Sequence, residues 1–234
     1  MRILITGASR GIGYETAKAL AVDGPHHVLA LSRNEAALRR LAEEVLDRQP
    51  KGHLHFLPFD LSRPDWAALD QALSSWDSLD SLINNAGLLV QKPFESLTDD
   101  DWLRSLQVNL LGPVALVRYL LPRLSKSARP HILNIGSMGG FQGSSKFPGL
   151  SAYSASKAAL ANLSECLAEE LRERGIAVNC LALGAVNTEM LAEAFPGFDA
   201  PLDSHEMGAY IARFALEGGK FFNGKVLPVS VSTP

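Results

Sequence analysis

One stretch near the start of the chain carries the strongest structural signal: Thr6-Gly7-Ala8-Ser9-Arg10-Gly11-Ile12-Gly13. It follows an apolar run at residues 2–5 and precedes a helical pattern, so the glycines stand at a strand-to-helix turn. Gly7 permits a tight turn, Gly11 lets the backbone approach a pyrophosphate, and Gly13 lets helix and strand pack closely. No Lys-Ser/Thr pair follows, which excludes a P-loop that hydrolyses nucleoside triphosphates. The stretch therefore predicts a dinucleotide site.

The rest of the chain alternates short apolar runs with longer amphipathic segments. Candidate strands are residues 2–5, 27–31, 54–59, 81–84, 130–135, 177–182 and 225–229, and candidate helices are residues 12–22, 35–48, 66–75, 99–124, 152–174 and a looser pair within 189–216. Most strands are continuous apolar runs, which favours a sheet covered by helices on both faces. We expect an α/β fold with one Rossmann-type, doubly wound domain over residues 1–234 and a central parallel sheet of about seven strands.

Composition excludes several classes of partner. Of 234 residues, 47% are hydrophobic and 20% charged, and the formal net charge is −3. Nucleic acid and anionic membranes need a concentrated basic surface, so neither is expected as a partner. No apolar stretch is long enough to span a bilayer, and no secretory signal is recognisable. Two separated cysteines and scattered histidines form neither a disulfide framework nor a metal pattern, so we expect a cytoplasmic protein without a metal site.

The end of the second candidate strand indicates which dinucleotide binds. An acid usually meets a free ribose 2′-hydroxyl about 20 residues after the glycines. Here Arg33 takes that place, and Arg10 can approach from the glycine loop. Two guanidinium groups suit a 2′-phosphate, which favours NADP(H). The alternative is that Arg33 is a solvated turn residue and Glu35 binds the hydroxyl.

Tyr153 and Lys157 stand four residues apart in a candidate helix, hence on one face. A phenol has an ordinary pKa of about 10, too high to exchange protons readily near neutrality. A nearby ammonium favours the phenolate and lowers that pKa, and an oxidised nicotinamide acts in the same direction. The pair therefore predicts a proton donor and acceptor, although a surface helix pair is the alternative.

Taken in order, these motifs resemble the classical short-chain dehydrogenase/reductase family over nearly the whole chain. The motifs are residues 6–13, Asp60-Leu61 after the third strand, Asn84-Asn85-Ala86-Gly87 after the fourth, Asn109, Ser137 after the fifth strand, and Tyr153 with Lys157.

The resemblance implies a catalytic group of Asn109, Ser137, Tyr153 and Lys157. Tyr153 would be the general acid in carbonyl reduction, and Ser137 would hydrogen-bond the carbonyl oxygen. Lys157 would bind the nicotinamide ribose, and Asn109 would break its helix and hold a water that links Lys157 to solvent. The cofactor-binding residues implied by the motifs are Gly7, Ser9, Arg10, Gly11, Ile12, Gly13, Arg33, Asp60, Leu61, Asn85, Ala86, Gly87, Tyr153, Lys157, Gly184, Val186 and Thr188.

Two features depart from the family pattern. Leu183-Gly184 stands where Pro-Gly is frequent, which predicts a less rigid cofactor loop. Ser137 and Tyr153 are sixteen residues apart, longer than is usual, with Ser144-Ser145-Lys146 as the candidate insertion. A surface insertion costs little, so the serine should still reach the site. Lys146 could contact an anionic substrate or lie in solvent.

The remaining predictions concern substrate and assembly. Residues 188–207 contain glycine and prolines between apolar and polar residues, as a substrate lid would. Apolar side chains there and on either side of the insertion favour an apolar or aromatic carbonyl or alcohol substrate; they are Phe141, Phe147, Met190, Leu191, Phe195 and Phe198. The helices at residues 99–124 and 152–174 would form a homodimer or homotetramer, as in the family, or simply cover the sheet. The resemblance implies an oxidoreductase that moves a hydride between nicotinamide and a carbonyl or secondary alcohol carbon, and the two arginines favour NADP(H) as its cofactor. The alternative is a catalytically silent NADP(H)-binding regulatory or interaction protein.

Overall fold

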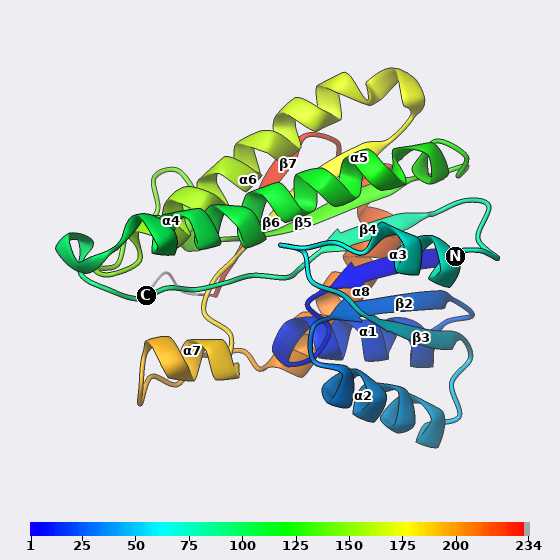
Figure 1. Cartoon of the computed structure of the whole chain (residues 1–234), viewed down its shortest axis with the longest axis horizontal. Helices are drawn as coiled ribbons and strands as arrows, with labels where there is room; N and C mark the ends of the chain where they lie inside the picture. Colours follow the sequence, from blue (N-terminus) through cyan, green and yellow to red (C-terminus); the bar gives the residue numbers. More distant parts are fainter. Residues whose placement is uncertain (232–234) are drawn as a thin grey trace.

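A computed structural model of the chain, which describes residues 1–231, contains one seven-stranded sheet (Figure 1). All neighbouring strands pair in parallel, in the order β3-β2-β1-β4-β5-β6-β7. The order reverses between β1 and β4, and in such sheets ligands bind where the strands end beside the reversal. The doubly wound α/β fold is confirmed. The strands are β1 (Arg2–Thr6), β2 (His27–Ser32), β3 (His53–Pro58), β4 (Ser81–Asn84), β5 (His131–Ser137), β6 (Ala177–Leu183) and β7 (Lys225–Val229).

Helices cover both faces of the sheet, three 3-10 turns lie between strands and helices, and one π-helix joins α4 to α5 within the described residues. Helices α1, α2 and α8 lie on one face, and α3 to α6 lie on the other (Figure 1). Their bounds are α1 (Gly11–Asp23), α2 (Glu35–Asp47), α3 (Trp66–Ala72), α4 (Asp99–Leu106), α5 (Gly112–Leu124), α6 (Ser151–Glu170), α7 (Glu189–Ala194) and α8 (Ser204–Phe221); the 3-10 turns are Phe94–Ser96, Met138–Gly140 and Arg172–Arg174, and a π-helix spans Gln107–Leu111.

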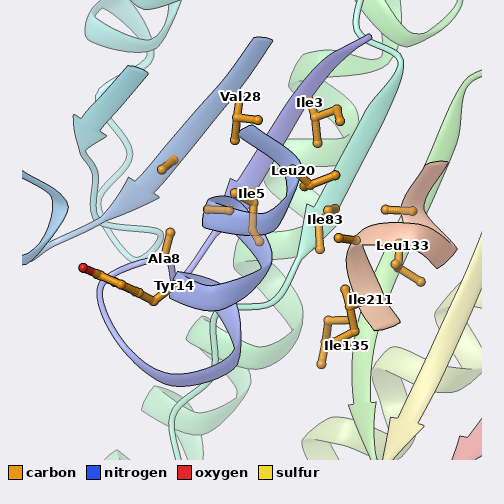
Figure 2. Packing of buried hydrophobic residues seen from close by; sticks show 14 of the residues in the cluster. Ile3, Ile5, Ala8, Tyr14, Leu20, Val28, Ile83, Leu133, Ile135 and Ile211 are labelled. Atoms are coloured by element: carbon orange, nitrogen blue, oxygen red, sulfur yellow. The ribbon is translucent and has the colours of Figure 1, made fainter. Parts of the chain in front are cut away.

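The hydrophobic core forms two clusters because successive strand residues point to opposite faces. Ile3 and Ile5 of β1 lie with Ile211 of α8 in one cluster (Figure 2). Leu4, between them in sequence, packs with Leu116 of α5 in the other cluster. Burial on both faces explains why the strands are continuous apolar runs. It also fixes the carboxyl ends of the strands in position.

Two predicted helices end differently in the structure. The helix predicted at residues 99–124 is interrupted by the π-helix Gln107–Leu111, so α4 and α5 are separate elements. The predicted helix at residues 152–174 ends at Glu170, and a 3-10 turn leads to Gly175, which has a φ of 67°. Only glycine adopts that left-handed conformation without strain, so it ends the helical run.

Helix α8 extends past residue 216, where the sequence predicts its end, to Phe221. Gly218 and Gly219 do not stop it. A Cβ at residue 219 would lie 3.1 Å from the ring of His131 on β5. The glycine therefore lets the helix approach the sheet closely, a tertiary role that outweighs low helix propensity.

Candidate active site

The glycine loop is held against the segment that follows β4. Gly7 has a φ of 72°, and a Cβ there would lie 2.7 Å from the Cα of Ala86. A Cβ at Gly13 would lie 2.4 Å from the carbonyl oxygen of Gly7. By contrast, a Cβ at Gly11 would meet nothing closer than a Thr188 methyl at 3.3 Å. Gly7 and Gly13 thus serve close backbone packing, whereas Gly11 faces the side chains of Thr188 and Glu189, which also line the cleft.

Thr6 and Asn85 fasten this loop. The Asn85 side-chain amide donates to the carbonyl oxygens of Thr6 at 3.0 Å and Gly7 at 3.2 Å. The Thr6 hydroxyl accepts from the backbone N–H groups of Asn85 and Ala86 at 3.1 and 3.0 Å. The sequence predicts Asn85 as a cofactor residue and assigns Thr6 no role. The role of Thr6 could have been inferred from its position, because a hydroxyl at the end of a buried strand needs a hydrogen-bond partner.

Ser137, Tyr153 and Lys157 line one cleft. Ser137 is the last residue of β5, whereas Tyr153 and Lys157 lie one turn apart on α6. The Lys157 Nζ lies 5.9 Å from the centre of the Tyr153 ring. Its ammonium donates at 2.8 Å to the carbonyl oxygen of Ile135, a contact that the sequence does not reveal.

Burial controls the titration of both α6 side chains. Burial raises the pKa of Tyr153, and its hydrogen bond with Ser137 acts in the opposite direction. Burial lowers the pKa of Lys157 to about 8. The sequence predicts a lowered phenol pKa, so Lys157 and a bound nicotinamide would have to outweigh the burial of Tyr153.

Asn109 lies at the middle of the π-helix Gln107–Leu111 and is fully buried. Its amide oxygen accepts from the N–H of Leu88 at 2.7 Å, and its amide nitrogen donates to the Leu88 carbonyl and the Ser156 hydroxyl, both at 2.9 Å. A Cβ at Gly87 would lie 3.5 Å from the Lys157 Nζ and 3.6 Å from the Asn109 amide oxygen. The predicted local break in the helix is confirmed, while the water remains a prediction. The hydrogen bond from Asn109 to Ser156 could not be predicted from the sequence.

The cleft has a volume of about 450 Å³ and extends from the glycine loop to α6. Every predicted site residue except the buried Asn109 lines it. The predicted residues along its walls are Gly7, Ser9, Arg10, Gly11, Ile12, Gly13, Arg33, Asp60, Leu61, Asn85, Ala86, Gly87, Ser137, Tyr153, Lys157, Gly184, Val186 and Thr188.

One end of the cleft carries charged groups after β2 and β3. Arg33 is exposed there. The Asp60 carboxylate accepts from the Ser62 N–H and hydroxyl at 2.8 and 2.7 Å, and these bonds, with smaller contributions from nearby arginines including Arg33, lower the pKa of Asp60. Arg10 pairs with Glu193 of α7 at 2.7 Å, a contact that the sequence does not predict.

The other end is apolar and lies under α7. Met190, Leu191 and Phe195 line it, and Phe195 meets Phe147 edge-on, with ring centres 5.9 Å apart. In Figure 1, α7 stands at the side opposite the N-terminus, where the parallel strands end. Lys146 donates to the Phe141 carbonyl and Ser144 hydroxyl of its own loop.

Comparison with known proteins shows which family the chain belongs to. A family model described as short chain dehydrogenase matches residues 1–197. The chain belongs to the classical short-chain dehydrogenase/reductase family. Members of this family use a nicotinamide cofactor.

Three relatives illustrate the similarity. A fatty acyl-CoA reductase of Acinetobacter baylyi is 37% identical over 195 residues, covering 81% of this chain and 63% of that protein. The 3-oxoacyl-(acyl-carrier-protein) reductase FabG of Chlamydia trachomatis is 28% identical and covers 97% of this chain and 94% of its own length. The crystal structure of a 3-ketoacyl-(acyl-carrier-protein) reductase from Brucella melitensis, complexed with NADH, matches with a TM-score of 0.86 and 28% identity, over 97% of this chain and 96% of that one.

The relatives differ from this chain in length. The chain spans 63% of the Acinetobacter baylyi fatty acyl-CoA reductase and 59% of mouse dehydrogenase/reductase SDR family member 7B. Within residues 1–231, none of the helices combines the length and apolar character required to cross a membrane. The same residues contain no group of three or more metal-ligating side chains.

Proposed function

We propose that the chain is an NADP(H)-dependent carbonyl reductase or alcohol dehydrogenase that moves a hydride between nicotinamide and a carbonyl or secondary alcohol carbon. The observation that carries this proposal is the meeting of Ser137, Tyr153 and Lys157 in the cleft onto which the glycine loop opens. Gly11 lines this cleft at the start of α1, where backbone N–H groups suit a cofactor phosphate. A bound nicotinamide supplies or accepts the hydride.

The side chains would handle the proton and the developing charge. In reduction, the Tyr153 hydroxyl would protonate the carbonyl oxygen, and the Ser137 hydroxyl would donate a hydrogen bond to it where negative charge develops. Lys157 would leave the Ile135 carbonyl to bind ribose hydroxyls and stabilise the phenolate. Asn109 would position the segment at Leu88 beside Lys157. It would also hold a water molecule that links Lys157 to solvent.

The charged end of the cleft supports NADP(H) over NAD(H). Arg33 lines the cleft after β2, where an acid would bind a ribose hydroxyl, and Arg10 of the glycine loop lines the same cleft. Glu35, the alternative ligand for that hydroxyl, accepts from Arg39 at 2.9 Å on the exposed surface of α2. Asp60 would accept from the adenine amino group.

Several broader proposals complete this function. Residues 1–234 would act as one catalytic domain, of which residues 232–234 lie outside the described part of the chain. Residues 188–207 would form the substrate lid, with its last four residues in the first turn of α8. The apolar lining under α7 favours an apolar carbonyl or alcohol substrate. We further propose a cytoplasmic homodimer or homotetramer.

NADPH oxidation with a panel of ketones, aldehydes and diketones tests the proposal. We expect turnover that falls by about a hundredfold or more in Tyr153→Phe, since the general acid is lost, while NADPH binding persists. Tyr119→Phe is the matched control, because that phenol pairs with Asp70 away from the cleft. Tight NADPH binding without turnover on any carbonyl would support the silent regulatory protein instead.

A further inference from the structure

Arg10, a proposed ligand of the cofactor 2′-phosphate, already has an anionic partner. Its guanidinium donates to the Glu193 carboxylate at 2.7 Å, across 183 positions of sequence. Both side chains are accessible, with 48% and 65% of their surfaces exposed. The hydrogen bond with Glu193 raises the pKa of Arg10. A second anion that needs the same guanidinium must therefore compete with a carboxylate.

The acidic side of α7 extends beyond this pair. Glu189 and Glu193 are four residues apart on α7, and side chains at that spacing share a helix face. A Glu189 carboxylate oxygen lies 3.6 Å from the place that a Cβ on Gly11 would occupy. Glu189 also acts electrostatically on Arg10. Two carboxylates thus face the loop that is proposed to bind cofactor phosphates.

The same short helix is also attached on the apolar side of the cleft. Phe195, next after α7, packs edge-on against Phe147, and Met190 and Leu191 line the cleft between the two attachments. Release of the ion pair would therefore free the acidic side of α7 while the aromatic contact remained. The ion pair is the attachment that a charged ligand can reach.

We infer that Glu193 is a specificity-determining residue that lowers the preference for NADP(H) by competing with the 2′-phosphate for Arg10. This inference rests on the proposed NADP(H) dependence. The 2′-phosphate carries between one and two negative charges near neutrality, so it must displace the carboxylate or share the guanidinium with it at a repulsive cost. NADH has a neutral hydroxyl at that position and leaves the ion pair intact.

The test is Glu193→Gln, which removes the charge and keeps the shape of the side chain. Dissociation constants for NADPH and NADH are measured at low ionic strength, where exposed charges are least screened. We expect NADPH to bind about two- to fivefold more tightly, the range of an exposed ion pair, and NADH to bind as before. Glu173→Gln, which removes an exposed carboxylate before β6 and outside the cleft, is the matched control and should change neither constant.

A double-mutant cycle with Arg10→Ala assigns the effect to the pair. In the Arg10→Ala background, Glu193→Gln should no longer improve NADPH binding. Weaker or unchanged NADPH binding by Glu193→Gln alone would overturn the inference, because the carboxylate would then orient Arg10 or be irrelevant to it. If the unmodified chain binds both cofactors equally, the proposed NADP(H) dependence itself fails. If it prefers NADPH and only the Glu193→Gln effect is missing, that dependence stands and this inference falls.

Discussion

Arg33 is the residue whose position bears most directly on cofactor choice. It lies exposed at the end of β2, lines the cleft and contributes to the lowered pKa of Asp60. Arg63 also lowers the pKa of Asp60 but does not line the cleft. Comparing variants of Arg33 and Arg63 therefore distinguishes direct contact with a ligand from a general electrostatic effect on this region.

We expect Arg33→Ala to weaken NADPH binding about tenfold or more and to leave NADH binding nearly unchanged. The physical reason is the loss of a charge-assisted hydrogen bond to the 2′-phosphate. Isothermal titration with each cofactor measures the effect, and Arg63→Ala is the charge-matched control. Equal weakening of NADPH and NADH would assign Arg33 a structural role and contradict the phosphate assignment.

At the scale of elements, His131 joins β5 to β6 and α8. Its Nδ1 hydrogen-bonds the Ala215 carbonyl at 3.2 Å, and its Nε2 faces the Asn179 amide nitrogen at 3.1 Å. The Asn179 amide oxygen accepts from the N–H of Lys225, which leaves its nitrogen as the donor to His131. The ring must therefore be neutral, with its proton on Nδ1. Burial lowers the pKa of His131 to about 4.

The His131 pKa predicts an acid-sensitive junction. A folded-state pKa below the unfolded value of about 6.5 favours the neutral ring, so its contribution to stability is complete above pH 6.5 and is lost as the pH falls toward 4. The shift corresponds to at most about 3 kcal/mol. We expect the free energy of unfolding, measured by urea denaturation at successive pH values, to decline over this interval.

His131→Asn should flatten that decline, since no group titrates there, although it also lowers stability at neutral pH. His55→Asn, which removes an exposed imidazole on β3, is the matched control and should keep the slope. An unchanged slope in His131→Asn would show that other groups control the acid response.

At the scale of the whole molecule, α4, α5 and α6 form the layer on one face of the sheet (Figure 1). Leu103 of α4 and Leu111 of the π-helix are exposed on this layer, at 65% and 47%. The proposed homodimer or homotetramer would use this layer. Removing exposed apolar side chains from water at an interface would lower the free energy of association.

We expect sedimentation of the unmodified chain to give the mass of two or four chains, and the double variant Leu103→Lys/Leu111→Lys to shift toward one chain. Two lysines introduced into an interface would be costly to bury. Leu46→Lys, at an exposed leucine of α2, is the control and should leave the mass unchanged. A monomeric unmodified chain would contradict the proposed assembly.

The candidate site could be predicted where the signal was local or ordered along the chain. The glycine loop and the pair Tyr153 and Lys157 were recognisable from spacing, and Ser137 followed from the family resemblance. All of them line one cleft. The roles of Thr6 and Ser156, and the pairing of Arg10 with Glu193, were not recognisable. Each depends on which polar atoms of distant segments come within about 3 Å of one another. The periodicity of the sequence does not predict such contacts.

The alternation of strands and helices, the glycine turn and the shared face of Tyr153 and Lys157 could all be predicted from the order of the amino acids. These features follow from backbone conformation and from periods of about 2 and 3.6 residues, which act over short distances in the chain. By contrast, the contact of Lys157 with the Ile135 carbonyl and the hydrogen bonds of Asn109 with Leu88 depend on the packing of distant segments. Burial and hydrogen-bond partners are properties of the assembled layers, since they depend on which segments lie together once the core has formed.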